Sequence, residues 1–120
     1  MLYTTIARIL FAIPFVVFGL LHFLFAGAMA SIVPVWLPGG IIWVFITGLC
    51  LLAAGISIII EQHAALACKL LAVLLFIFVV TVHLPGLLEA GSMNASLAAM
   101  LKDIGLIGGA LTYAGIFDST

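Results

Sequence analysis

Four long apolar segments alternate with short polar or glycine- and proline-rich connections along the chain. The apolar segments cover about residues 6–25, 41–60, 64–84 and 96–117. A helix needs about 20 largely apolar residues to cross the hydrocarbon core of a bilayer, and each segment reaches that length. The pattern therefore predicts four transmembrane helices in a single transmembrane domain, residues 1–120.

The first connection, residues 31–40, contains two prolines and two glycines, which interrupt a helix. Its Trp36, together with Trp43 at the start of the second segment, suits the headgroup region of a membrane. We expect an apolar loop at the interface, acting either as a simple anchor or as a cover that dips inward over the bundle.

Other breaks in the pattern are more local. Pro14 lies inside the first segment, removes one backbone donor and predicts a kink. Residues 61–63 form a short polar turn, and Leu84-Pro85-Gly86 predicts the end of the third helix. Near the start of that helix, the long side chain of Lys69 can extend to the interface.

The composition supports a membrane location. Hydrophobic residues make up 68% of the 120 residues and charged residues only 6%, more apolar surface than a soluble domain of this size can bury. Four spans also leave no room for a soluble catalytic domain. The net charge is −1 with three basic residues, which argues against a nucleic-acid surface. We predict an all-α integral membrane protein, a four-helix transmembrane bundle in contact with the lipid bilayer.

The first segment also resembles a secretory signal, because Arg8 precedes an apolar run and Ala28-Met29-Ala30 could serve as a cleavage site. The apolar run is longer than the 7–15 residues usual for such signals, so we expect it to be retained as a span. An even number of spans places both termini on one side. Arg8 and Lys69 lie on that side and Lys102 toward the other, which favours cytoplasmic termini.

Unusual polar residues converge on the outer half of the predicted bundle, meaning the half opposite the termini. His22 and His83 lie near the outer ends of the first and third spans, and Lys102 and Asp103 lie about two turns inside the fourth. Trp36 and Glu89 belong to the two outer connections. Ionisable residues at membrane depth are costly and usually face protein or water, so this group is the candidate site.

Adjacent helical residues point about 100° apart, so Lys102 and Asp103 cannot face the same partner. Lys102 shares a stripe with Gly105 and Gly109, whereas Asp103 shares one with Ala99 and Ala110. The two glycines form a small-xxx-small pair, which predicts close approach of another helix from the same chain or another copy.

Four roles for the polar group remain open at this stage. Asp103 could pair with a histidine or Lys102 and lock helices together. The group could bind a quinone, lipid or other small apolar molecule, with His22 and His83 as donors. His22, His83 and Asp103 could also hold a metal or haem, or form a proton pathway. The chain has no glycine-rich phosphate loop, no Cys-x-x-Cys pair and no evident Ser-His-Asp set.

The chain resembles the DoxX family of small bacterial and archaeal membrane proteins. The matching residues cover nearly the whole chain in order: Arg8, Gly19-Leu-Leu-His22-Phe23, Val33-Pro34-Val-Trp36-Leu37-Pro38, Trp43, Thr47-Gly48, Gly55 and Leu101-Lys102-Asp103-x-Gly105-Leu106-x-Gly108-Gly109-Ala110-Leu111.

The resemblance implies a four-helix membrane bundle, and some relatives are described as the membrane subunit of a thiosulfate:quinone oxidoreductase. Many relatives have Gly-x-x-Lys late in the first helix, where this chain has Gly19-Leu-Leu-His22. A titratable imidazole replaces a fixed cation there, so an anion-binding role does not carry over to that position.

We therefore expect a multi-pass protein of a bacterial or archaeal cytoplasmic (inner) membrane. The predicted function is to bind or handle a small apolar or redox-active molecule, with a quinone as candidate cofactor. The predicted ligand-binding residues are His22, Trp36, His83, Lys102 and Asp103. We expect no catalysis by this chain alone; its candidate partners are a second copy or a soluble redox protein. The alternatives are a structural or assembly subunit and a small proton-coupled transporter.

Overall fold

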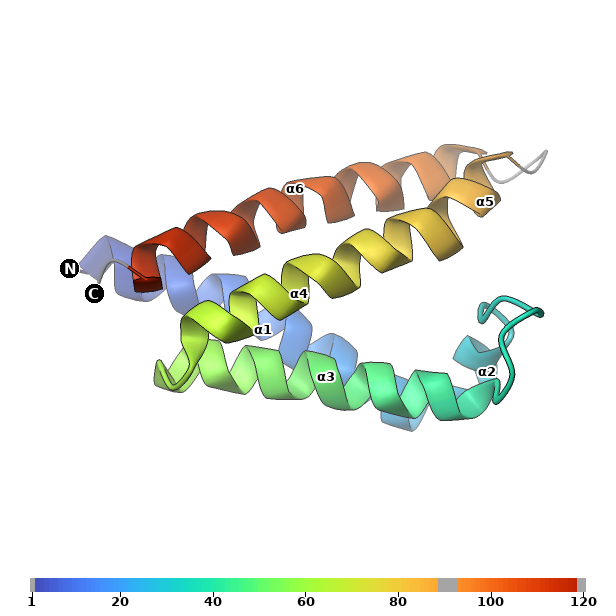
Figure 1. Cartoon of the computed structure of the whole chain (residues 1–120), viewed down its shortest axis with the longest axis horizontal. Helices are drawn as coiled ribbons and strands as arrows, with labels where there is room; N and C mark the ends of the chain where they lie inside the picture. Colours follow the sequence, from blue (N-terminus) through green and yellow to red (C-terminus); the bar gives the residue numbers. More distant parts are fainter. Residues whose placement is uncertain (1, 89–92, 119–120) are drawn as a thin grey trace.

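The computed structural model describes residues 2–88 and 93–118, and these residues form helices and connecting loops without any β-strand (Figure 1). The elements are α1 (Leu2–Leu24), α2 (Ala26–Ala30), α3 (Ile41–Ile60), α4 (Ala64–Phe78), the π-helical turn η1 (Val79–His83), α5 (Leu84–Leu88) and α6 (Met93–Asp118).

Four helical stretches in the described chain are long and apolar enough to cross a membrane. They are Leu2–Leu24, Ile41–Ile60, Ala64–Leu88 and Ala95–Asp118. Large apolar side chains remain exposed along all of them, which suits contact with lipid rather than water. The fold is thus an all-α bundle, and the chain is a multi-pass membrane protein in contact with the bilayer.

The four long helices are arranged as two antiparallel pairs. α1 packs along α3, and α4 packs along α6. The pairs meet where α1 begins, α6 ends and the α3–α4 turn lies, which we call the terminal end (Figure 1). They diverge toward the outer end, where α2 and α5 lie. Aromatic rings join α1 to α6, since the Phe11 and Tyr113 ring centroids are 5.1 Å apart.

The hydrophobic core lies in the terminal half, where both pairs contribute. Small side chains alternate with larger ones there, which lets four helices approach a common centre. The buried cluster consists of Ala12, Phe15, Leu51, Ala54, Ile58, Ala67, Cys68, Leu71, Ala72, Leu75, Ala110 and Ala114.

Glycines allow two helices to approach closely where α1 packs on α3, whereas the glycines of α6 do not have this role. A Cβ added at Gly19 would lie 2.9 Å from the Gly48 carbonyl oxygen. In contrast, nothing lies within 4 Å of a Cβ added at Gly105, and one added at Gly109 meets only the Phe11 side chain. The prediction that another helix of this chain approaches closely at Gly105 and Gly109 is therefore wrong. At the height of Gly109, α6 contacts α1 through the Phe11 ring, which keeps the two backbones apart.

Two prolines lie within helical segments. α1 continues through Pro14 as one helix. The expected end of the third span at Leu84-Pro85-Gly86 is wrong, because the helix continues to Leu88. Pro85 cannot donate a hydrogen bond and would clash with the carbonyl four residues earlier in an α-helix. The wider turn η1 avoids that clash, and its Leu84 N–H bonds to the Val79 carbonyl.

The loop between α2 and α3 is held by backbone geometry and one side chain. Gly39 and Gly40 have φ angles of 106° and 46°, which side chains other than glycine rarely adopt. The Trp43 indole N–H donates to the Pro38 carbonyl and ties the loop to the start of α3. Trp36, in the middle of the loop, is 70% exposed.

Candidate functional site

His83 and Asp103 form a polar pair between the third and fourth spans. The His83 Nε2 atom lies 2.8 Å from Asp103 Oδ2, and their side chains are only 19% and 6% exposed. Asp103 is the one buried charged residue in the described part of the chain. The structure thus joins two of the five predicted site residues directly, and a third, Lys102, lies beside them.

Local structure explains why the pair forms. Asp103 lies on the same face of α6 as Ala110, which is fully buried, so the predicted stripe does face the chain's own helices. His83 is the last residue of η1, the turn that Pro85 imposes. Because a π turn holds an extra residue, it changes the direction of the side chains that follow from that of a regular α-helix.

Lys102 lies at the edge of this pair and links it to the other helix pair. Its Nζ atom is 3.8 Å from Asp103 Oδ1 and 5.3 Å from the centroid of the Phe18 ring on α1. An ammonium over an aromatic face is attracted by the ring quadrupole. The lysine side chain is 53% exposed, so it reaches out to this ring and is not enclosed.

His22 lies on the α1 side and does not reach the pair. Its Nδ1 atom is 2.7 Å from the Phe18 carbonyl oxygen of its own helix, and its ring lies edge-on to the Phe18 ring at 6.5 Å. Phe18 therefore contacts both Lys102 and His22. This aromatic ring was absent from the predicted site, since nothing in the sequence separates it from the other apolar residues of α1.

Trp36, another predicted member of the outer group, is not brought to the pair. No hydrogen bond, ion pair or ring contact joins Trp36 to it among the residues that the structure describes. Its predicted role as a lid or wall stays a prediction. Glu89 lies outside the described residues.

A metal would need several ligands at one point. Within residues 2–88 and 93–118, no three histidine, cysteine, aspartate or glutamate side chains gather as a metal site. His22 bonds to its own helix while His83 and Asp103 bond to each other, so these three do not form the proposed ligand set.

One imidazole nitrogen of the His83–Asp103 pair remains available for hydrogen bonding or proton transfer. An ionised Asp103 can only accept, so the Nε2–H of His83 is the donor in the bond between them. His83 Nδ1 has no partner among the described residues. It accepts a hydrogen bond when the ring is neutral and donates one when the ring is protonated. A carboxylate that fixes an imidazole in this way suits it for binding or proton transfer.

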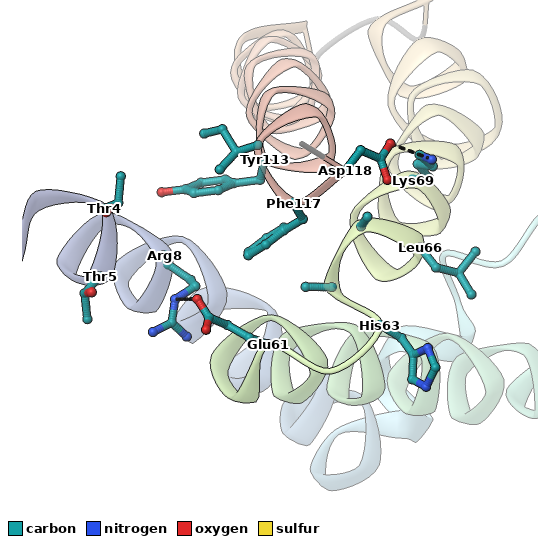
Figure 2. A pocket seen from close by; sticks show the side chains of 13 residues that line it. Thr4, Thr5, Arg8, Glu61, His63, Leu66, Lys69, Tyr113, Phe117 and Asp118 are labelled. Atoms are coloured by element: carbon teal, nitrogen blue, oxygen red, sulfur yellow. Dashed lines mark ion pairs between the residues drawn. The ribbon is translucent and has the colours of Figure 1, made fainter. Parts of the chain in front are cut away.

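A second polar group, which the sequence analysis did not recognise as a site, lies at the terminal end (Figure 2). Arg8 Nε is 3.1 Å from Glu61 Oε1, and Lys69 Nζ is 2.9 Å from Asp118 Oδ2. These pairs border a cavity of about 760 Å³. The sequence pattern places all four charged residues at the same end of the predicted spans. Comparing the charged residues at both ends of the spans would therefore have identified this group.

Arg8 also completes the end of α3. Its Nη1 atom donates to the carbonyl oxygen of Ile58 over 3.1 Å and to that of Ile59. The last carbonyls of a helix lack partners within the helix, and a cation there also complements the helix dipole. Arg8 was predicted only to orient the chain in the membrane; the structure gives it a capping role as well.

Comparison with curated proteins and with solved structures gave no match. A family model does match most of the chain, from residue 11 to residue 104. The match runs from the first core residues of α1 to Asp103 on α6, so it includes the His83–Asp103 pair. The chain belongs to this family, which is described as a domain of unknown function (DUF8561).

Proposed function

We propose that this protein binds a small apolar molecule with a carbonyl or hydroxyl group, of the quinone or lipid class, at the His83–Asp103 pair. One observation carries the proposal: a buried carboxylate holds an imidazole whose second nitrogen has no partner among residues 2–88 and 93–118, within a span that faces lipid. Intramembrane ionisable residues are costly and usually serve a function.

The chemistry of the pair fits such a ligand. A neutral His83 accepts a hydrogen bond from a hydroxyl at Nδ1, and a protonated one donates to a carbonyl. Lys102 adds three donors beside the pair, and Phe18 adds an apolar face. These groups match the mostly apolar sites with a few placed polar atoms that hold small molecules. His22 borders Phe18, and Trp36 remains a candidate cover for the site.

This proposal agrees with the resemblance of the sequence motifs to those of the DoxX family. We further propose a bacterial or archaeal cytoplasmic membrane and cytoplasmic termini, which Arg8 and Lys69 at the terminal end support. In this proposal the chain is a binding subunit and not a complete enzyme, and its partner is a second copy or a soluble redox protein.

A structural role is the second candidate, and a specific observation favours it. Both oxygens of Asp103 face cations or donors of the chain itself, His83 on one side and Lys102 on the other. A satisfied polar pair of this kind can hold two membrane helices in register without any ligand.

The test is mass spectrometry and a visible spectrum on protein extracted gently with its native lipids. We expect a stoichiometric quinone-like or lipid molecule in the wild type and at least a tenfold loss of it in His83→Phe. Thr112→Val is the matched control, because it removes an exposed hydroxyl of the same helix that bonds only to the Gly108 carbonyl of that helix among the described residues.

The same preparations distinguish the two candidates. Thermal unfolding of each variant shows whether the fold persists. A bound molecule that Asp103→Asn retains in full would refute the site. A wild type that carries no such molecule, yet loses stability on His83→Phe, would instead identify the pair as a structural link between helices.

A further inference from the structure

We propose that the terminal cavity and the adjacent groove between α3 and α4 bind one membrane phospholipid with a zwitterionic head group bearing a primary ammonium, as in an ethanolamine phospholipid. This inference concerns the opposite end of the molecule and does not rest on the function proposed above.

The cavity has the size and position of a head-group site. Its volume of about 760 Å³ lies within the range of small-molecule sites. Its walls come from the start of α1, the α3–α4 turn, the start of α4 and the end of α6 (Figure 2). All four belong to the ends of apolar spans, the depth at which lipid head groups lie.

The described side chains that line the cavity carry both signs of charge in equal number. Arg8 and Lys69 are the cations, and Glu61 and Asp118 are the carboxylates. Figure 2 shows the Arg8–Glu61 pair and the Lys69–Asp118 pair on two sides of the pocket. A phosphate with a tethered ammonium has the same two charges, so it can bind with both signs matched.

The existing ion pairs leave capacity for such a head group. Arg8 uses Nε and Nη1 on the chain itself, and its Nη2 has no partner among the described residues. Lys69 and Asp118 are both about half exposed, and ion pairs of that kind contribute little to stability. Lys69 can therefore exchange Asp118 for the lipid phosphate, and Asp118 can exchange Lys69 for the lipid ammonium, at little cost in stability.

An apolar groove continues from the cavity along the bundle. It has a volume of about 430 Å³ and shares two lining residues, His63 and Leu66, with the cavity. Its walls reach from the turn to Cys50 on α3 and Ile77 on α4, which is about 20 Å at the helical rise of 1.5 Å per residue. A polar cavity joined to an apolar groove matches a head group joined to an acyl chain.

Head-group chemistry decides among phospholipids. A primary ammonium donates hydrogen bonds to the exposed carboxylates of Glu61 and Asp118, which are 57% and 52% exposed. A trimethylated ammonium has no N–H to donate. The hydroxyls of a glycerol head group can donate to the carboxylates, but this head group has no positive charge, so its phosphate adds an uncompensated negative charge beside them.

Native mass spectrometry of delipidated protein tests this directly. The full chain is titrated with ethanolamine, choline and glycerol phospholipids that carry identical acyl chains. We expect one ethanolamine phospholipid to bind with at least fivefold preference over the other two. Equal retention of all three lipids would overturn the proposal, since it would reduce the cavity to ordinary contact with the bilayer.

Two pairs of variants locate the site. Asp118→Asn should lower the ethanolamine preference about two- to fivefold, the scale of a single exposed ion pair, whereas Thr112→Val, at an exposed position of the same helix, should not. Ala53→Phe fills the groove and should reduce retention of all three lipids, whereas Ala98→Phe on the exposed face of α6 should not.

The outcomes separate this proposal from the previous one. Binding that neither Asp118→Asn nor Ala53→Phe alters would refute the phospholipid site. Asp103→Asn should leave the preference for the ethanolamine head group unchanged, because that carboxylate bonds to His83 in the outer half and does not line the cavity or the groove. The experiments can therefore refute one proposed binding site without refuting the other.

Discussion

Gly19 and Gly48 lie face to face where α1 crosses α3. A Cβ at Gly19 would be 2.9 Å from the Gly48 carbonyl oxygen, and a Cβ at Gly48 would be 3.1 Å from that of Gly19. Real Cβ atoms rarely come so close to backbone atoms. The two helices can therefore pack at this distance only because both positions lack side chains, which is the usual basis of tight helix contacts in membranes.

Replacing Gly48 with valine should separate α1 from α3. The new Cβ would meet the Cβ of His22 at 2.7 Å as well as the backbone of α1, so the helices themselves must move. Overpacking of this kind costs about 1–3 kcal/mol. Thermal unfolding in detergent, followed by circular dichroism, should show a lower midpoint.

Gly105→Ala is the control for that experiment. A Cβ there meets nothing within 4 Å, and alanine favours a helix over glycine by about 1 kcal/mol, so stability should stay constant or rise. A marked loss of stability in Gly105→Ala would mean that another copy of the chain packs against this face of α6.

The His83–Asp103 pair should show strong coupling in a double-mutant cycle. His83→Leu leaves the buried Asp103 carboxylate with only Lys102 nearby, 3.8 Å from Oδ1. Removing one partner of a buried pair costs about 3–5 kcal/mol. The double variant with Asp103→Leu should recover most of that loss, because no buried charge is then left unpaired and Lys102, which loses its carboxylate partner, is 53% exposed.

The cycle is read from unfolding free energies of the two single variants and the double variant. Additive losses would show that the two side chains stabilise the fold independently, which contradicts the 2.8 Å contact between them. Lys102→Ala should cost less than His83→Leu, because Lys102 is 53% exposed and more distant from the carboxylate.

Arg8→Lys should loosen the end of α3. The guanidinium bonds to the Ile58 and Ile59 carbonyls and to Glu61 at once, which a single ammonium cannot reproduce. Hydrogen exchange should become faster at the amides that close the end of α3, such as that of Gln62, which follows the helix and bonds to the Ser57 carbonyl. Lys69→Arg serves as the reference, since that lysine makes one exposed ion pair. Unchanged exchange in Arg8→Lys would contradict the capping role.

His63→Gly should stabilise the α3–α4 turn. His63 has φ 54°, in the left-handed region that costs a residue with a side chain about 1 kcal/mol. Glu61, with φ 57°, has the same backbone conformation but pairs with Arg8. Glu61→Gly should therefore raise the midpoint of thermal unfolding less than His63→Gly does. An equal rise in both variants would show that the Arg8–Glu61 pair adds no stability.

The sequence by itself determined the number and nature of the long helices. Continuous apolar runs fix these elements because a backbone in lipid must satisfy its hydrogen bonds within the segment, whatever the neighbouring helices do. The predicted limits of the second segment, 41–60, are those of α3. The predicted face of Asp103 was also correct, since helical periodicity is a local property and Asp103 and Ala110 are both buried.

The tertiary structure alone decided which helices touch and which polar groups meet. Each of the four spans holds at least one glycine, and only the antiparallel pairing of α1 with α3 selects Gly19 and Gly48 for contact and leaves Gly105 open. Pairing of α4 with α6, together with the π turn before Pro85, brings His83 to Asp103 and leaves His22 on the opposite pair. These contacts depend on how each helix is rotated about its axis and on which helix it packs against. The helix surfaces are nearly uniformly apolar, so the order of residues within one helix does not indicate either choice.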